Sequence, residues 1–254
     1  MFPVFTISFH HSKEVFVCCL IVSLRCVFWV GLSIRGGGND SPRPASQRAA
    51  AFILTAAMLT ALTAPAFAET WDIEKGDITV KAGKTEGTNM VSQGEQKDVE
   101  DTGTVITGKS DKNTVTIEAE NEGDKVEVTL KDVNIDASRG SEAAVNVTGK
   151  GDTNIELDGD NALKSGAGHA GSEHNKTDTS GELTIQDKDK NGSLEAVGGF
   201  KGAGIGSAGS NDAQVKITGG NITATSDDWG AGIGSGSDGT AYVAVSYTHL
   251  RAHE

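Results

Sequence analysis

Short runs of alternating apolar and polar residues recur through the second half of the chain, and most are followed closely by Gly, Asn or Asp. A period of two in segments rich in β-branched residues predicts short β-strands. The first series comprises VEVTL (126–130), NIEL (154–157), ELTI (182–185), QVKI (214–217) and YVAV (242–245). Their last apolar residues are spaced by 27 to 32 residues, and the longest interval contains an extra polar turn near 188–193. These spacings predict a repeat of about 28 residues.

Two further series of short segments accompany the first. The second comprises VNID (133–136), ALKS (162–165), SLEA (193–196) and NITA (221–224). The third is built of small residues: EAAVNV (142–147), GAGHAG (166–171), and GAGIGS at both 202–207 and 230–235. Aligning the hexapeptides by their letters places His169 where Ile205 and Ile233 fall. Each repeat therefore contains three short strands.

This pattern predicts an all-β protein, a right-handed parallel β-helix with three short strands in each coil of about 28 residues. A single coil cannot bury its own apolar edge, so coils must stack about 4.8 Å apart and align like residues into inward ladders. One such ladder is expected through Leu130, Leu157, Ile185, Ile217 and Val245. A β-sandwich would also show short strands, but it does not require a constant coil length.

The chain divides at the limits of the repeat. Residues 126–245 are expected to form the regular coils, and residues 69–125 an irregular capping coil at the N-terminal end. Strand candidates in the capping coil lie at 71–73, 78–80, 104–107 and 114–117, around the polar stretch 82–103.

The two ends of the chain differ from the middle. Residues 48–68 combine Arg48, an apolar run and the small-residue site Ala66-Phe67-Ala68, which predicts a signal peptide cleaved after Ala68 and a secreted or cell-surface protein. We interpret residues 1–47 as a spurious upstream extension of the reading frame, with a transmembrane anchor as the alternative. Residues 246–254, SYTHLRAHE, are interpreted as a non-native tail translated from adapter-like sequence, so that its histidines carry no chemistry.

Composition narrows the classes of partner. The formal net charge of the chain is −13, and the segment after residue 68 is more acidic still, which argues against nucleic acid. All three cysteines, Cys18, Cys19 and Cys26, precede the predicted cleavage site. The mature protein is therefore expected to lack disulfides. We also expect it to have no stable membrane span and to be a monomer.

One corner of the predicted coil gathers residues that suit carbohydrate. SDDWG (226–230) and GGFKG (198–202) precede the two GAGIGS copies, so the repeat places Trp229 beside Lys201 and Asp228 beside Phe200, with Asp227 adjacent. An exposed aromatic ring can stack on the apolar face of a sugar. Lysine and aspartate can bind hydroxyl groups, or can meet a sugar carboxylate directly or through Ca²⁺. The alternative is a turn whose aromatic residues simply cover the glycine-rich corner.

Metal and catalytic motifs are weak. The turns carry Asp132, Asp158, Asp160, Asp187 and Asp189, which either point into water or share Ca²⁺, so the presence and location of a metal site stay open. His169 and His174 lack the spacing of a zinc site. A polysaccharide lyase would need a strong base facing Ca²⁺, but Arg139 lies far in register from Asp227. We assign no catalytic residue.

The segments VTLKDVNID, NIELDGDNALKSG, SLEAVGG, ITGGNITAT and GAGIGS resemble secreted carbohydrate-binding-domain-containing β-helix repeat proteins of gut clostridia and their relatives, over residues 69–245. Some relatives resemble pectate lyases in fold, which implies binding of acidic polysaccharide with Ca²⁺. We therefore expect non-catalytic binding of a polysaccharide or cell-wall glycan. The alternatives are a polysaccharide lyase-like enzyme and the structural stalk of a larger surface adhesin.

Overall fold

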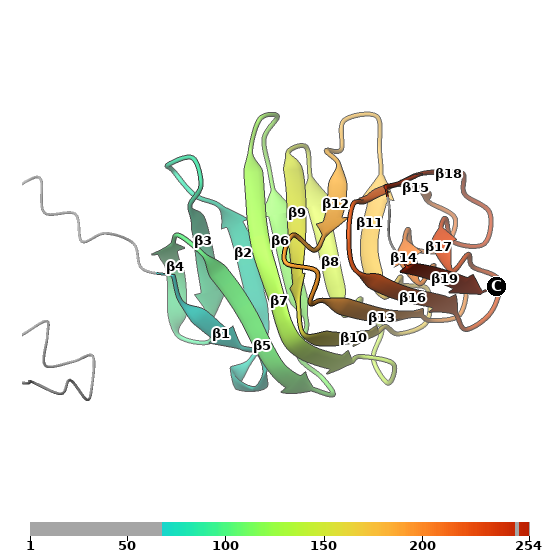
Figure 1. Ribbon diagram of the computed structural model, residues 1–254, viewed down its shortest axis with the longest axis horizontal. Helices are drawn as coiled ribbons and strands as arrows, with labels where there is room; N and C mark the ends of the chain where they lie inside the picture. The colour runs from blue at the N-terminus through green and yellow to red at the C-terminus, as the bar shows by residue number, and fades with distance from the viewer. Residues whose placement is uncertain (1–67, 247–248, 254) are drawn as a thin grey trace, which may run out of the picture. The chain divides into compact units, whose positions relative to one another are not determined.

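A computed structural model describes residues 68–246 and 249–253 of the chain (Figure 1). These residues form nineteen strands and one short 3₁₀ helix, and most strands pair in parallel with the strand one coil away. The predicted all-β parallel solenoid is therefore confirmed. Residues 1–47 and most of the predicted signal peptide lie outside the described residues.

Three parallel sheets run along the solenoid. The first sheet contains the first half of β7 (Lys125–Asp136), β9 (Asp152–Asp158), β12 (Leu183–Gln186), β15 (Asp212–Ile217) and β18 (Ala241–Val245). The second contains the second half of β7, β10 (Asp160–Lys164), β13 (Ser193–Gly198), β16 (Asn221–Ser226) and β19 (His249–His253). The third contains β8 (Val145–Gly149), β11 (Ser172–Lys176), β14 (Ile205–Gly206) and β17 (Ile233–Gly234). The first and second predicted series thus each form one sheet, whereas in the third series GAGHAG (166–171) lies just before the strand that pairs, β11.

The predicted single ladder of the first sheet is wrong at one step. Leu130 pairs with Leu157 as expected, but Ile185 pairs with Ile155, two residues earlier in β9. A shift of two residues keeps every apolar side chain on the inner face, so the hydrophobic pattern alone cannot detect it. The polar turn at 187–192 then folds over Leu157, because a Cβ added to Gly192 would lie 2.5 Å from the Leu157 Cβ.

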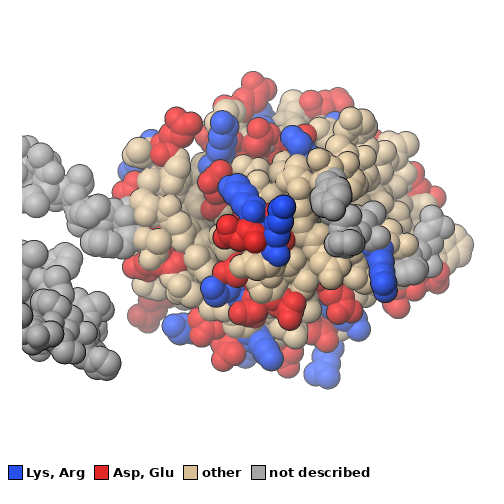
Figure 2. Space-filling view, in the orientation of Figure 1, with Lys and Arg blue, Asp and Glu red and all other residues tan. Residues whose placement is uncertain are grey.

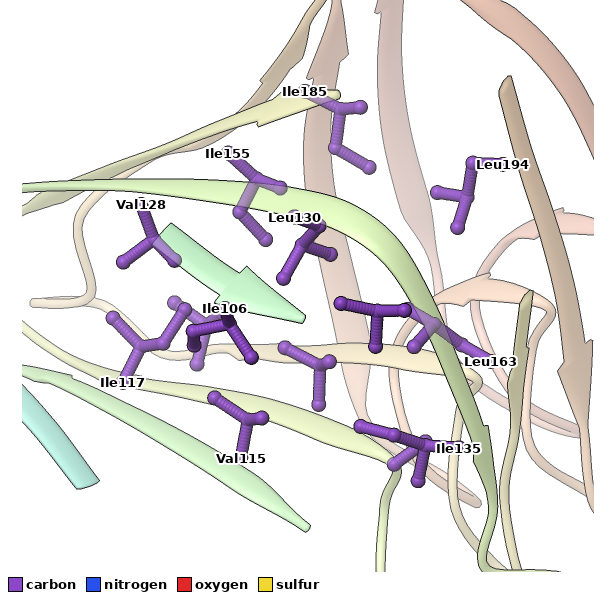
Figure 3. Close-up of a cluster of buried hydrophobic side chains, with 14 of the residues drawn as sticks. Ile106, Val115, Ile117, Val128, Leu130, Ile135, Ile155, Leu163, Ile185 and Leu194 are labelled. Atoms are coloured by element: carbon purple, nitrogen blue, oxygen red, sulfur yellow. The ribbon is translucent and has the colours of Figure 1, made fainter. Parts of the chain in front are cut away.

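The core consists of these inward ladders. Ile106, Leu130, Ile155, Ile185 and Leu163 are each at most 1% exposed and pack against one another inside the coils (Figure 3). The second sheet adds a ladder in which Leu163 lies between Ile135 and Ala196. Since each coil contributes only a few large side chains, truncation of one to alanine is expected to cost about 2–5 kcal/mol.

The segment 69–125, expected to be one irregular capping coil, contains strands of two stacked coils. Its elements are β1 (Thr70–Asp72), η1 (Ile73–Lys75), β2 (Ile78–Ala82), β3 (Asn89–Gln93), β4 (Gln96–Asp101), β5 (Thr104–Ser110) and β6 (Val115–Ala119). Strand β1 pairs in parallel with β5, and β2 with β6. The polar stretch 82–103 forms two antiparallel strands, β3 and β4, that extend the third sheet beyond β2.

A buried aspartate fixes this end of the solenoid. Asp101 is fully buried and accepts hydrogen bonds from the Trp71 indole Nε1 (2.8 Å), the Glu69 amide (3.1 Å) and the Gly103 amide (3.0 Å). Because a buried carboxylate is tolerated only when donors surround it, these bonds bind the first strand to the end of the β3–β4 hairpin.

The third sheet shows why GAGIGS repeats. Ile205 pairs with Ile233 and is fully buried, while the Ala203 amide donates to the Ser207 carbonyl and closes a tight turn. The predicted alignment of His169 with Ile205 is wrong. Ile205 pairs with Ser172, and His169 lies in register with Gly202. GAGHAG forms the corner before strand β11, where glycine allows a close approach of the backbones. Alignment by identical letters therefore shifted this hexapeptide by three residues.

Gly204 tests this packing. A Cβ added there would lie 2.5 Å from the Gly232 carbonyl oxygen and 2.7 Å from the Thr225 amide nitrogen, both backbone atoms of the next coil. We expect Gly204→Ala to lower the free energy of unfolding by about 1–3 kcal/mol, a fall of several degrees in melting temperature. Ser210→Ala, on an exposed loop of the same coil, should leave the melting temperature within about 1 °C. Equal melting temperatures for the two variants would contradict the described register.

Asp212 gives a pH-dependent test of coil stacking. One of its carboxylate oxygens accepts hydrogen bonds from the Thr240 amide (2.7 Å) and the Thr240 hydroxyl (2.8 Å), and these bonds lower the pKa of Asp212 below its usual 3.8. A lowered pKa means that the stabilisation is fully present above pH 3.8 and is lost as the pH falls through the folded-state pKa. We therefore expect Asp212→Ala to reduce the melting temperature most near neutral pH. Thermal melts from about pH 7 to 2 should show the gap to wild type closing below pH 3.8, and a constant gap would refute this.

Candidate functional site

The corner between the second and third sheets brings the predicted site residues together. We call residues 199–202 and 227–230 the aromatic corner. The Lys201 amide donates to the Asp228 carbonyl (2.8 Å), and Ile205 pairs with Ile233 just beyond, so Trp229 lies in register with Lys201. The same register sets Asp228 beside Phe200.

The backbone of the aromatic corner is left-handed at one stacked position. Gly168, Lys201 and Trp229 occupy this position in successive coils, with φ of 88°, 69° and 67°. Residues other than glycine, asparagine and aspartate rarely adopt this conformation, and it costs roughly 1–2 kcal/mol for a bulky side chain. The fold therefore favours glycine here, and two coils carry large side chains instead.

The side chains of the aromatic corner point outward. Trp229 is 70% exposed and Phe200 45% exposed. The Lys201 Nζ lies 5.5 Å from the centre of the Phe200 ring, a cation–π distance worth about 0.5–1 kcal/mol at an exposed site. Asp227 and Asp228 are exposed beside them. The surface thus offers apolar ring faces, one cation and two carboxylates.

A serine side chain links the two coils of the aromatic corner by hydrogen bonds to their backbones. The Ser226 hydroxyl donates to the Gly202 carbonyl (2.8 Å) and accepts from the Gly230 amide (3.1 Å). It therefore links two neighbouring coils at the point where the chain leaves the second sheet. A ligand at this corner would meet a preformed surface and would not have to order it.

A histidine–glutamate pair lies next to the aromatic corner, and the sequence analysis missed it. The alignment of the hexapeptides places His169 at the position of Ile205 and Ile233, but its side chain is 31% exposed and its Nδ1 lies 2.9 Å from Glu173 Oε2. Glu173 is 3% exposed and also accepts from the Ala170 amide (3.0 Å) and from Asn175 Nδ2 (2.9 Å). The four-residue spacing between His169 and Glu173 was the available signal.

The second histidine belongs to a different environment. His174 is buried, and its Nε2 lies 2.9 Å from the Gly181 carbonyl oxygen. The two histidines thus contact different partners. Among residues 68–246 and 249–253, no three His, Cys, Asp or Glu side chains are grouped in a way that could hold a metal ion.

The aspartates of the turns bond mainly to the next coil. Asp158 pairs with the Lys131 amine at 2.7 Å, and this hydrogen bond raises the pKa of Lys131 above its usual 10.5. Asp132 accepts from the Asp160 amide (3.1 Å), and Asp160 from the Ser193 hydroxyl (2.7 Å). Asp187 caps its own turn through the amides of Asn191 (3.2 Å) and Gly192 (3.1 Å). These four carboxylates therefore have structural partners without Ca²⁺, whereas Asp189 is exposed.

Arg139 is remote from the predicted carboxylates. It is exposed on the loop after β7, and that loop occupies the same corner of the solenoid three coils before Asp227. At about 4.8 Å per coil, the backbones at Arg139 and Asp227 are about 14 Å apart.

A groove opens on the outer face of the first sheet. Its volume is about 570 Å³, and its lining comes from the β2–β3 hairpin, strands β5, β7 and β9, and the turn after β12. No sequence pattern reveals this groove, because the segments that line it are spread from residue 86 to residue 189. Figure 2 shows that lysines lie among the acidic side chains over the visible face of the molecule.

Comparisons with known proteins agree with the architecture. A family model described as a β-helix repeat matches residues 215–237, which run from β15 through β17. Searches of curated proteins and of solved structures give no match to this chain. No helix in the described part of the chain is long and apolar enough to cross a membrane. The stacked coils and the family match together identify β-helix repeats.

Proposed function

We propose that this chain binds polysaccharide without cleaving it, at the aromatic corner, as a secreted or cell-surface protein. One observation carries the proposal: Trp229 is 70% exposed and also adopts a left-handed backbone conformation. Exposure forgoes the burial energy of a large aromatic side chain, and the conformation adds strain. Folding gains from neither, so a role in binding accounts for both.

The chemistry of the corner fits a sugar chain. The Trp229 and Phe200 rings come from adjacent coils, whose backbones lie about 4.8 Å apart. Aromatic faces can cover the apolar C–H face of a pyranose, and Lys201, Asp227 and Asp228 can exchange hydrogen bonds with its hydroxyl groups. An acidic glycan would engage Lys201, and Ca²⁺ could link its carboxylates to Asp227 and Asp228.

Export supports the same proposal. The Arg48–Ala68 segment has the charge, apolar run and small-residue site of a signal peptide. A strongly acidic chain of glycine-rich coils that lacks cysteine after residue 68 suits a stable extracellular scaffold. A cell-wall or extracellular glycan would then be the accessible ligand.

The His169–Glu173 pair favours a second candidate function, a polysaccharide lyase-like enzyme. A buried carboxylate that holds one imidazole nitrogen directs the other nitrogen outward, which is the arrangement of an oriented general base. Incubation of the protein with polygalacturonate and Ca²⁺ separates the two functions. Unsaturated products that absorb in the ultraviolet, lost in His169→Ala, would establish the lyase. The non-catalytic proposal expects no product.

Trp229→Gly separates binding from folding. Glycine relieves the left-handed strain, so we expect the free energy of unfolding to stay within about 1 kcal/mol of wild type. Retention on insoluble polysaccharide, measured by pull-down and affinity electrophoresis across a glycan panel, should fall about tenfold or more, which corresponds to about 1.4 kcal/mol of binding free energy.

Tyr242 provides the matched control. It is 66% exposed, but it lies on β18 in the first sheet, away from the aromatic corner. Tyr242→Ala should therefore retain wild-type binding. Unchanged retention in Trp229→Gly, or equal losses in both variants, would refute the assignment of binding to this corner. A purely structural stalk would show no retention in any variant.

A further inference from the structure

The charges of the aromatic corner distinguish among the glycans that could bind there. Asp227 and Asp228 are both exposed, and neither carboxylate forms a hydrogen bond or an ion pair with another residue in the described part of the chain. Two adjacent carboxylates without a cation repel each other. The aromatic corner therefore holds negative charge that a cationic ligand would neutralise.

Lys201 leaves these carboxylates without a partner. Its backbone amide donates to the Asp228 carbonyl at 2.8 Å, so the two residues are neighbours, yet its amine forms no ion pair with any described residue. The amine lies instead 5.5 Å from the centre of the Phe200 ring. With two carboxylates and a single amine, the aromatic corner keeps an excess of negative charge.

The indole of Trp229 adds a second attraction for a cation. Tryptophan is the side chain whose ring face attracts ammonium groups most strongly. Trp229 is 70% exposed and directly follows Asp228 in the chain. Among the described residues, the one lysine over an aromatic ring is Lys201 over Phe200, so the faces of the indole carry no cation. An ammonium group on a sugar could therefore meet a carboxylate and an indole face at the same place.

The charge of the whole protein favours the same class of ligand. The formal net charge of the chain is −13, and acidic side chains are spread over the visible face of the molecule (Figure 2). Such a field attracts a polycation and repels polyuronates and sulfated glycans. A neutral glycan gains nothing from this field.

We propose that the aromatic corner selects polysaccharides with free amino groups, whose ammonium groups bind Asp227 and Asp228 while a sugar ring stacks on Trp229. The inference rests on the proposed function and names the class of its ligand, a polycationic amino-sugar polymer. Lys201 is the one cation of the aromatic corner, so it opposes this ligand, whereas it would attract a uronate. The sign of its effect on binding therefore identifies the class of glycan.

The test compares chitosan oligosaccharides with chitin oligosaccharides, which differ in the acetyl group on the amine, and with oligogalacturonate. Calorimetry at a mildly acidic pH keeps the free amine charged. We expect the chitosan oligosaccharides to bind about tenfold or more tightly than the other two ligands. Asp227→Asn combined with Asp228→Asn should remove most of this preference and leave the affinity for chitin oligosaccharides within about twofold of wild type.

Two further variants control for charge. Asp178→Asn combined with Asp189→Asn removes the same charge from exposed turns that lie between β11 and β12 and between β12 and β13, away from the aromatic corner. It should keep the affinity for chitosan oligosaccharides within about twofold of wild type, because exposed charges at a distance are screened by salt. Lys201→Gln should keep or strengthen chitosan binding, since it removes the opposing cation.

The outcomes separate this inference from the proposed function. Equal affinity for chitosan and chitin oligosaccharides, tighter binding of oligogalacturonate, weaker chitosan binding in Lys201→Gln, or equal losses in the two double variants would overturn the selection of amino sugars. Retention on another polysaccharide that is lost in Trp229→Gly would still support glycan binding at the aromatic corner in each of those cases. If no glycan of any charge binds, both proposals fail.

Discussion

Backbone pairing between neighbouring coils is the constraint on which every other feature of this protein depends. A coil of about 28 residues has too few large side chains to form a core, so its apolar residues are buried only when the next coil covers them. Parallel pairing brings the backbones to about 4.8 Å and leaves no room for a side chain wherever two corners approach closely. Gly204 is such a position, because Gly232 and Thr225 of the next coil occupy the space of its missing Cβ.

The same pairing creates the aromatic corner. Each coil repeats the backbone conformation of its neighbour, so the left-handed turn at Gly168 is imposed again at Lys201 and Trp229. The fold thus fixes the backbone conformation at this position, and the sequence determines which side chain is exposed there. Because Ser226 links the two coils, the backbone that carries Trp229 is held in place without support from the core. Rigidity of this kind lowers the entropy lost when a ligand binds.

Sequence patterns predicted the features that repeat and missed those that depend on insertions. The three strands of each coil and the pairing of Leu130 with Leu157 follow from a period of two and a constant spacing. The pairing of Ile185 with Ile155 does not, because a two-residue shift leaves the apolar pattern unchanged. His169 was misplaced since identical letters were aligned across coils of unequal length. The groove could not be predicted, because register alone brings its distant segments together.

A repeat fold also explains how a costly exposed residue can coexist with so small a core. Each coil contacts only its neighbours, so a strained or exposed residue on one corner has little effect on a face several coils away. The cost of holding Trp229 exposed is therefore local. In an ordinary globular domain such a cost would draw on one shared core. In a solenoid, the side chains displayed on one coil can therefore be varied independently of those on distant coils.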